Sequence, residues 1–115
     1  MTRDELAARI GDESLVLIDV RTPEEFTGET GFPDDPRQGH IPGARNVPVN
    51  ELIGLTRQEL EEMVGAPPGA EVVVYCHSGG RSGFAAEVLA VAGYDARNYP
   101  GSWREWSRDP SLPAE

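Results

Sequence analysis

The stretch EVVVYCHSGGRSGFAAEVLAVA, residues 71–92, decides the fold. Its first five residues predict a buried strand, because an apolar run of this length is typical of a strand covered on both faces. A tight Gly-rich loop, CHSGG, follows. A helix is then predicted from Arg81 to Ala92, with Gly93 ending it. One face of this helix carries Phe84, Ala85, Val88, Leu89 and Ala92.

The remaining chain continues the alternation of strands and helices. The apolar run Leu15–Ile18 predicts a second strand buried on both faces, and shorter strands are expected at Arg45–Val47 and Ala96–Tyr99. Capping boxes predict three further helices, which start after Thr2, Thr22 and Thr56. The first is expected to run to about Ile10 and the third to about Val64. We therefore expect an α/β fold with an open, mainly parallel central sheet and helices on both faces.

The segment TGETGFPDDPRQG, residues 27–39, holds three glycines and two prolines and shows no periodicity. It predicts an irregular surface loop, which is long for a connection between a helix and a strand. The chain length of 115 residues fits one domain over residues 1–115.

Composition excludes several functions. The net charge is −10 and all ten basic residues are arginine, which argues against nucleic-acid binding and excludes lysine chemistry. No apolar run approaches the ~20 residues of a membrane span, and the start MTRDELAARIG lacks the features of a signal peptide, so we expect a cytoplasmic protein. Cys76, His40 and His77 are too few for a structural zinc site, and no metal or other cofactor is expected.

Cys76 is the candidate for chemistry. It lies between the most hydrophobic strand and a helix N-terminus, where backbone N–H groups and the helix dipole stabilise an anion such as a thiolate. Gly79 and Gly80 allow the loop to curl around the sulfur, and Arg81 adds a positive charge at the rim. Because Cys76 is the only cysteine, any sulfur chemistry must be completed by another molecule.

Each of these residues also has a structural interpretation. A lone cysteine is most often a small buried hydrophobic residue, although the strand, Gly-rich loop and helix around Cys76 favour function here. We expect the His77 side chain to point to solvent rather than into the loop, and His40 to be structural. The pairs Glu24-Glu25 and Glu61-Glu62 are expected to be solvated helix surface.

Three segments together resemble the successive signatures of rhodanese domains. They are LIDVRTPEEF (17–26), GHIPGARNVPV (39–49) and YCHSGGRSGFAAEVLAVAGY (75–94). The loop before Gly39 and the closing YPGSWREWSRDPSLPAE (99–115) are similar to the catalytic C-terminal domain of two-domain thiosulfate and mercaptopyruvate sulfurtransferases. The segment CHSGGRS is instead similar to free-standing bacterial rhodaneses.

The resemblance implies a sulfurtransferase that holds sulfur as a persulfide on Cys76. An anionic donor such as thiosulfate would load the cysteine, and a thiol, cyanide or a protein would accept the sulfur. The implied substrate-binding residues are those of the loop, namely His77, Ser78, Gly79, Gly80 and Arg81. The implied supporting residues are Ser82 together with Asp19 and Arg21, which would brace neighbouring loops, while Arg45 is a candidate for the pocket rim.

Two other functions remain open on sequence alone. Cysteine phosphatases and arsenate reductases of related fold place five residues between cysteine and arginine, whereas four separate Cys76 from Arg81 here, a tight fit for a tetrahedral oxyanion. A non-catalytic rhodanese module that binds partners is the other alternative. Such modules commonly lack the cysteine that this chain keeps.

Overall fold

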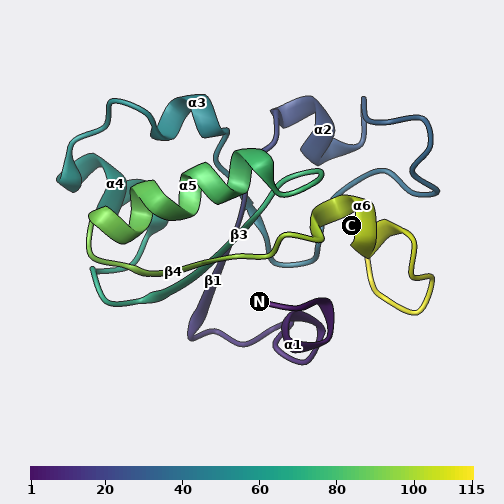
Figure 1. Cartoon of the computed structure of the whole chain (residues 1–115), viewed down its shortest axis with the longest axis horizontal. Helices are drawn as coiled ribbons and strands as arrows, with labels where there is room; N and C mark the ends of the chain where they lie inside the picture. Colours follow the sequence, from purple (N-terminus) through teal and green to yellow (C-terminus); the bar gives the residue numbers. More distant parts are fainter.

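The computed structural model describes all 115 residues and contains one four-stranded sheet. Its strands are β1 (Leu15–Asp19), β2 (Arg45–Asn46), β3 (Glu71–Tyr75) and β4 (Asp95–Asn98). They lie in the order β2-β1-β3-β4, and every neighbouring pair is parallel (Figure 1). The expected open parallel sheet is thus confirmed, with strand boundaries within a residue of those predicted for β2 and β4.

Six helices connect and cover the strands. They are α1 (Arg3–Ala7), α2 (Pro23–Thr27), α3 (Val49–Leu52), α4 (Arg57–Val64), α5 (Gly80–Val91) and α6 (Ser102–Ser107). The three capping boxes at Thr2, Thr22 and Thr56 are confirmed, since each threonine accepts the N–H of the glutamate three residues later. The first helix is shorter than expected. Sequence did not predict α3 and α6, which begin without a side-chain cap.

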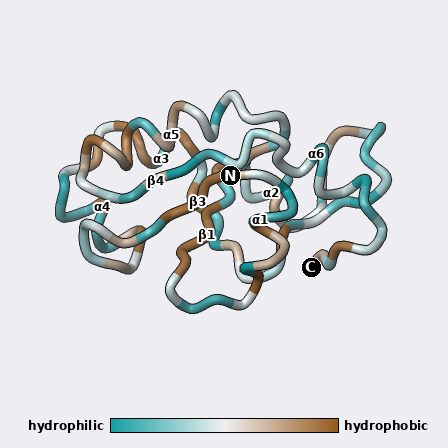
Figure 2. Tube along the Cα trace, turned by 60° about the horizontal axis from the view of Figure 1, so that its bottom comes forward, coloured by the Kyte–Doolittle hydropathy of each residue, from teal (hydrophilic) through white to brown (hydrophobic).

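The two faces of the sheet carry separate hydrophobic cores, because successive side chains of a strand point to opposite sides. On one face, Val72 and Val74 of β3 join a core with residues of α3, α4 and α5. On the other, Val73 and Tyr75 pack with Leu6 of α1 and the two tryptophans of α6. Helices therefore lie on both sides of the sheet (Figure 1), and Figure 2 shows hydrophobic colour along β1, β3 and α5.

The inward face of α5 differs from the prediction. Its buried residues are Ser82, Ala85 and Leu89, whereas Phe84 is 49% exposed. The helix is rotated so that Ser82 faces Cys76, and Phe84, two residues further along, then points away from the core. Including Phe84 in the core face was wrong, because periodicity alone does not show which of several apolar stripes turns inward.

The carboxyl ends of β1 and β3 lie side by side, since Asp19 is opposite Tyr75 in the parallel register. Cys76 and the active loop, which we define as residues 76–81, follow directly at this edge. Residues 27–39 also pass here as the expected irregular segment, since no helix or strand falls within 28–44. No helix in the structure combines the length and the apolar character that crossing a membrane requires.

Candidate active site

Cys76 lies at the end of β3 and is almost fully buried, with 1% exposure. Its Sγ accepts a hydrogen bond from the backbone N–H of Gly79 over 3.1 Å and one from the Ser82 hydroxyl over 3.3 Å. Gly79 has a φ of +98°, and a β-carbon there would lie 2.8 Å from the carbonyl oxygen of Pro100. Only glycine therefore allows the loop to turn its N–H toward the sulfur at this point.

These donors change the acidity of the thiol. Burial by itself raises the pKa of Cys76, because it disfavours the charged thiolate. Hydrogen bonds from the Ser82 hydroxyl and from the backbone N–H groups of Ser82, Gly79 and Ser78 act in the opposite direction and prevail. The pKa of Cys76 therefore lies below that of an ordinary thiol, and the site favours the nucleophilic thiolate.

Residues of α6 form hydrogen bonds with the backbone of the active loop. The N–H of Cys76 donates to Ser102 Oγ over 3.1 Å, and the Ser102 hydroxyl donates to the carbonyl of Tyr99 over 2.9 Å. The N–H groups of Trp103 and Arg104 donate to the carbonyls of Cys76 and His77, both over 3.0 Å. These carbonyls are thereby turned toward α6, away from the inside of the loop.

Ser102 has an unusual backbone. It is fully buried, and with a φ of +57° it is the one non-glycine residue of the chain in the left-handed region. Such a conformation costs free energy and persists where the surrounding structure requires it. Sequence reasoning missed this residue, because nothing in the segment PGSWREW predicts a left-handed serine.

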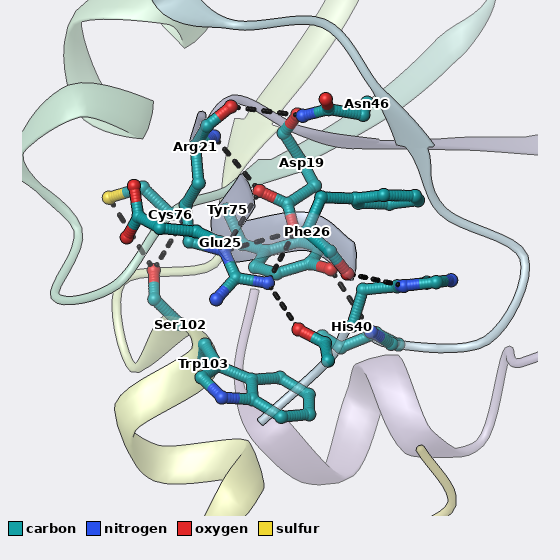
Figure 3. Close-up of polar contacts among 12 residues, drawn as sticks. Asp19, Arg21, Glu25, Phe26, His40, Asn46, Tyr75, Cys76, Ser102 and Trp103 are labelled. Atoms are coloured by element: carbon teal, nitrogen blue, oxygen red, sulfur yellow. Dashed lines mark hydrogen bonds and ion pairs between the residues drawn. The ribbon is translucent and has the colours of Figure 1, made fainter. Parts of the chain in front are cut away.

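Asp19 and Arg21 form a buried ion pair beside the active loop, with exposures of 0% and 1%. Arg21 Nη2 donates to Asp19 Oδ2 over 2.8 Å and to the carbonyl of Gly39 over 2.6 Å (Figure 3). The Arg21 guanidinium lies 5.9 Å and 5.3 Å from the ring centroids of Tyr75 and Trp103. The pair thus joins the end of β1 to the segment before His40 and to α6.

The His77 side chain does not point to solvent, and that expectation was wrong. Its Nε2 lies 2.9 Å from Asp35 Oδ2, its ring stacks on Phe32 at a centroid distance of 3.7 Å, and its side chain is 12% exposed. Arg108 donates to the other oxygen of Asp35 over 2.7 Å. The long segment 27–39 therefore packs directly against the active loop, a contact that local sequence patterns do not encode.

Arg81 is bound by an acidic partner rather than standing alone at the rim. Its Nη1 and Nη2 donate to Glu25 Oε1 and Oε2 over 2.8 Å and 3.2 Å. The Glu25 side chain is 12% exposed, so the expectation that it is solvated surface was wrong. Burial raises the pKa of Glu25, but the hydrogen bonds from Arg81 and the Thr22 backbone, together with the positive charges of Arg81 and Arg21, outweigh it, and the pKa lies below the ordinary value. Glu25 therefore stays ionised and neutralises Arg81.

A hollow of about 600 Å³ opens beside this ion pair. We call it the donor hollow; it is lined by Thr22, Glu25, Thr30, Gly31, Phe32, Pro33, His77, Ser78 and Arg81. Two other candidates lie outside it. Arg45 donates to the carbonyl of Val64 over 2.7 Å, away from the pocket rim, and His40 stacks on Phe26 and contacts its carbonyl.

A buried cysteine at the junction of a parallel strand and a Gly-rich loop is the arrangement that the sequence signatures indicated. The family model for the rhodanese-like domain matches residues 2–109. The chain therefore belongs to the rhodanese-like family.

Named relatives give the comparison more detail. The protein in the crystal structure of a "Probable Thiosulfate Sulfurtransferase" is 46% identical in sequence, and the two structures match with a TM-score of 0.85. The match covers all of this chain and 46% of the other chain. The thiosulfate sulfurtransferase of Pseudomonas aeruginosa is 35% identical over 99% of this chain and 45% of its own length. A sulfur carrier protein, TtuD of Thermus thermophilus, is 38% identical over 84% of this chain and 40% of its own. The chain thus spans less than half the length of these relatives.

Proposed function

We propose that residues 1–115 act as one rhodanese domain that transfers sulfane sulfur through a persulfide on Cys76. The observation that carries this proposal is the pair of hydrogen bonds from Gly79 and Ser82 to Sγ, which favour a thiolate inside a closed loop. The names of the relatives support the same reaction class. The proposed binding residues are the loop residues His77, Ser78, Gly79, Gly80 and Arg81, supported by Asp19, Arg21 and Ser82.

In the first half-reaction, the Cys76 thiolate attacks the sulfane sulfur of a donor such as thiosulfate. A new S–S bond forms, the bond between the sulfane sulfur and the sulfonyl sulfur breaks, and its electron pair leaves with sulfite. The product is the Cys76 persulfide anion. The loop that holds the thiolate can hold this anion, because its N–H groups and the Ser82 hydroxyl donate toward the sulfur.

In the second half-reaction, a thiol, cyanide or a protein removes the outer sulfur and restores the thiolate. The acceptor is a separate molecule, because the chain has no second cysteine to form a disulfide with Cys76. A reducing compartment such as the cytoplasm suits this chemistry, since it keeps a single thiol free.

The two alternative functions, a cysteine phosphatase or arsenate reductase and a non-catalytic binding module, have less support. Bidentate pairing with Glu25 holds the Arg81 guanidinium at the rim of the donor hollow, where it does not encircle an oxyanion as a phosphatase arginine must. A purely binding module has no need for donors directed at the sulfur.

Mass spectrometry after incubation with thiosulfate tests the proposal directly. We expect one sulfur atom to be added to Cys76 and thiocyanate to form when cyanide follows, and Cys76→Ser should abolish both. Failure to form a persulfide with thiosulfate or with any organic sulfane donor would overturn the proposal. Hydrolysis of an aryl phosphate that depends on Cys76 would favour the phosphatase instead.

A further inference from the structure

The donor hollow holds little free positive charge for a site that would receive an anionic donor. Arg81 is the one arginine that lines the donor hollow, and both ends of its guanidinium are bound to Glu25. The net charge of the chain is −10, although salt screens distant charges beyond ~8 Å. A dianion that enters the hollow meets the Glu25 carboxylate at the place where a free guanidinium would attract it.

Glu25 is held firmly in this position. Its Oε1 accepts hydrogen bonds from the N–H and the hydroxyl of Thr22, both over 3.2 Å, in addition to the one from Arg81. The carboxylate therefore closes the capping box of α2 and neutralises Arg81 at the same time. Moving it aside to release Arg81 breaks both sets of contacts, so a donor must compete with Glu25 for the arginine.

The donor hollow is also larger than an inorganic anion requires. Its volume of about 600 Å³ falls within the range of roughly 300 to 1,000 Å³ that is usual for organic ligands. Phe32 is 48% exposed there and stacks on His77. The Phe32 carbonyl accepts hydrogen bonds from the Gln38 side-chain amide over 2.9 Å and from the Asp35 N–H over 3.0 Å. These bonds hold the Phe32 backbone in place.

Together these features point to an organic sulfur carrier of low charge. We propose that the donor hollow favours sulfane donors that have an organic group and at most one negative charge, with Glu25 repelling dianions and Phe32 packing against the organic group. This inference rests on the proposed sulfur transfer and names the class of donor that the same site takes. Thiosulfate then loads Cys76, but slowly.

Three related sulfane donors distinguish the effect of the donor's charge from the effect of its size. Thiosulfate is a dianion without carbon, methanethiosulfonate is a small monoanion, and benzenethiosulfonate is a monoanion with an aromatic ring. Each gives its sulfane sulfur to the Cys76 thiolate and releases sulfite, methanesulfinate or benzenesulfinate, so charge and atoms balance in every case. The measured quantity is kcat/KM for persulfide formation, followed by mass spectrometry, with the rates for free cysteine as the chemical reference.

Relative to free cysteine, we expect the protein to prefer methanethiosulfonate to thiosulfate, and benzenethiosulfonate to methanethiosulfonate. Glu25→Gln keeps the size of the side chain and an acceptor for Thr22 but removes the charge. It should raise the thiosulfate value on the order of tenfold and the values of the two monoanions by less, because one negative charge is repelled less than two. Raising the salt concentration should shrink this difference. Glu24→Gln is the matched control, because it removes one carboxylate from the adjacent, exposed residue.

Phe32→Ala should lower the benzenethiosulfonate value by about three- to tenfold more than the values of the other two donors. The inference is overturned if the wild type shows no preference relative to free cysteine, or if Glu25→Gln and Glu24→Gln behave alike while persulfide still forms. Absence of persulfide from all three donors would overturn the proposed function itself. The wild-type comparison needs no variant, so a misfolded Glu25→Gln protein does not prevent the test.

Discussion

The backbone N–H of Cys76 donates to the hydroxyl oxygen of Ser102 over 3.1 Å, although 26 residues separate the two in sequence. Ser102 adopts a left-handed backbone to reach this position. The contact fixes the peptide that leads into Cys76, and α6 holds the next two carbonyls. The orientation of the active loop is therefore set in part by α6, which lies on the face of the sheet opposite α5.

Ser102→Ala should remove this support. It leaves the N–H of Cys76 and the carbonyl of Tyr99 without partners, which costs about 1–3 kcal/mol of unfolding free energy. The rate of persulfide formation should fall on the order of tenfold, since the sulfur is no longer aligned. Ser102→Gly should be more stable than the alanine variant but equally slow, because glycine accepts the positive φ.

Ser107→Ala is the control for this pair of variants. Ser107 is equally buried and lies on the same helix, but its hydroxyl donates to the carbonyl of Arg104, remote from the sulfur. Urea denaturation and persulfide formation are measured on all three proteins. A Ser102→Gly protein with wild-type loading would show that the hydroxyl has no part in positioning Cys76.

Ser82→Ala should raise the pKa of Cys76. The folded protein lowers this pKa, so the thiolate forms at a lower pH than in an unfolded chain. Removing the Ser82 hydroxyl, which favours the thiolate, shifts the pH profile of iodoacetamide alkylation upward. At neutral pH the alkylation rate should fall about three- to tenfold. An unchanged profile would mean that the backbone N–H groups alone stabilise the thiolate.

Arg81→Ala and Glu25→Gln should not act independently. Removing Arg81 alone leaves the Glu25 carboxylate beside the loop without its partner, so thiosulfate loading should fall by more than tenfold. The double variant should regain part of that loss, because the stranded negative charge is gone. The comparison uses kcat/KM for thiosulfate in all four proteins. If the double variant is as slow as Arg81→Ala, the unpaired Glu25 charge does not cause the loss.

Arg21→Met should destabilise the protein by about 3–5 kcal/mol, because it leaves the Asp19 carboxylate buried without a partner. Asp19→Asn in the same chain should recover part of this loss, since asparagine carries no charge and its side-chain oxygen can still accept the backbone N–H of residue 21. Urea denaturation measures both effects. Arg97→Met, which breaks an exposed ion pair of β4, is the control and should cost below about 1 kcal/mol.

Arg37 joins the segment 27–39 to the C-terminal residues. Its guanidinium donates to the carbonyls of Trp106, Ser107, Asp109 and Leu112 over 2.8–3.2 Å. Arg37→Met should therefore speed hydrogen exchange and proteolysis in residues 107–115 at least several-fold. The exposed Arg104 provides a control, and Arg104→Met should leave both rates unchanged. Equal protection in both variants would show that the tail is held by apolar packing alone.

The sequence by itself determined the fold class and the position of Cys76. Both follow from local patterns: apolar runs for β1 and β3, capping boxes for α1, α2 and α4, and a Gly-rich loop at Cys76. These signals lie within one strand, one turn or one loop, so neighbouring residues suffice to specify them.

Only the tertiary structure decided what surrounds the sulfur. Three contacts carry this part of the site. Ser102 accepts the N–H of Cys76, Glu25 pairs with Arg81, and Asp35 contacts His77. The partners in each contact lie 26 to 56 residues apart in sequence. No local pattern encodes such pairs, because they depend on which strand ends meet in the sheet and how α6 packs against it. The same reason explains why Glu25 and His77 were expected at the surface. The residues that cover their side chains, Arg81 for Glu25 and Phe32 and Asp35 for His77, come from elsewhere in the chain.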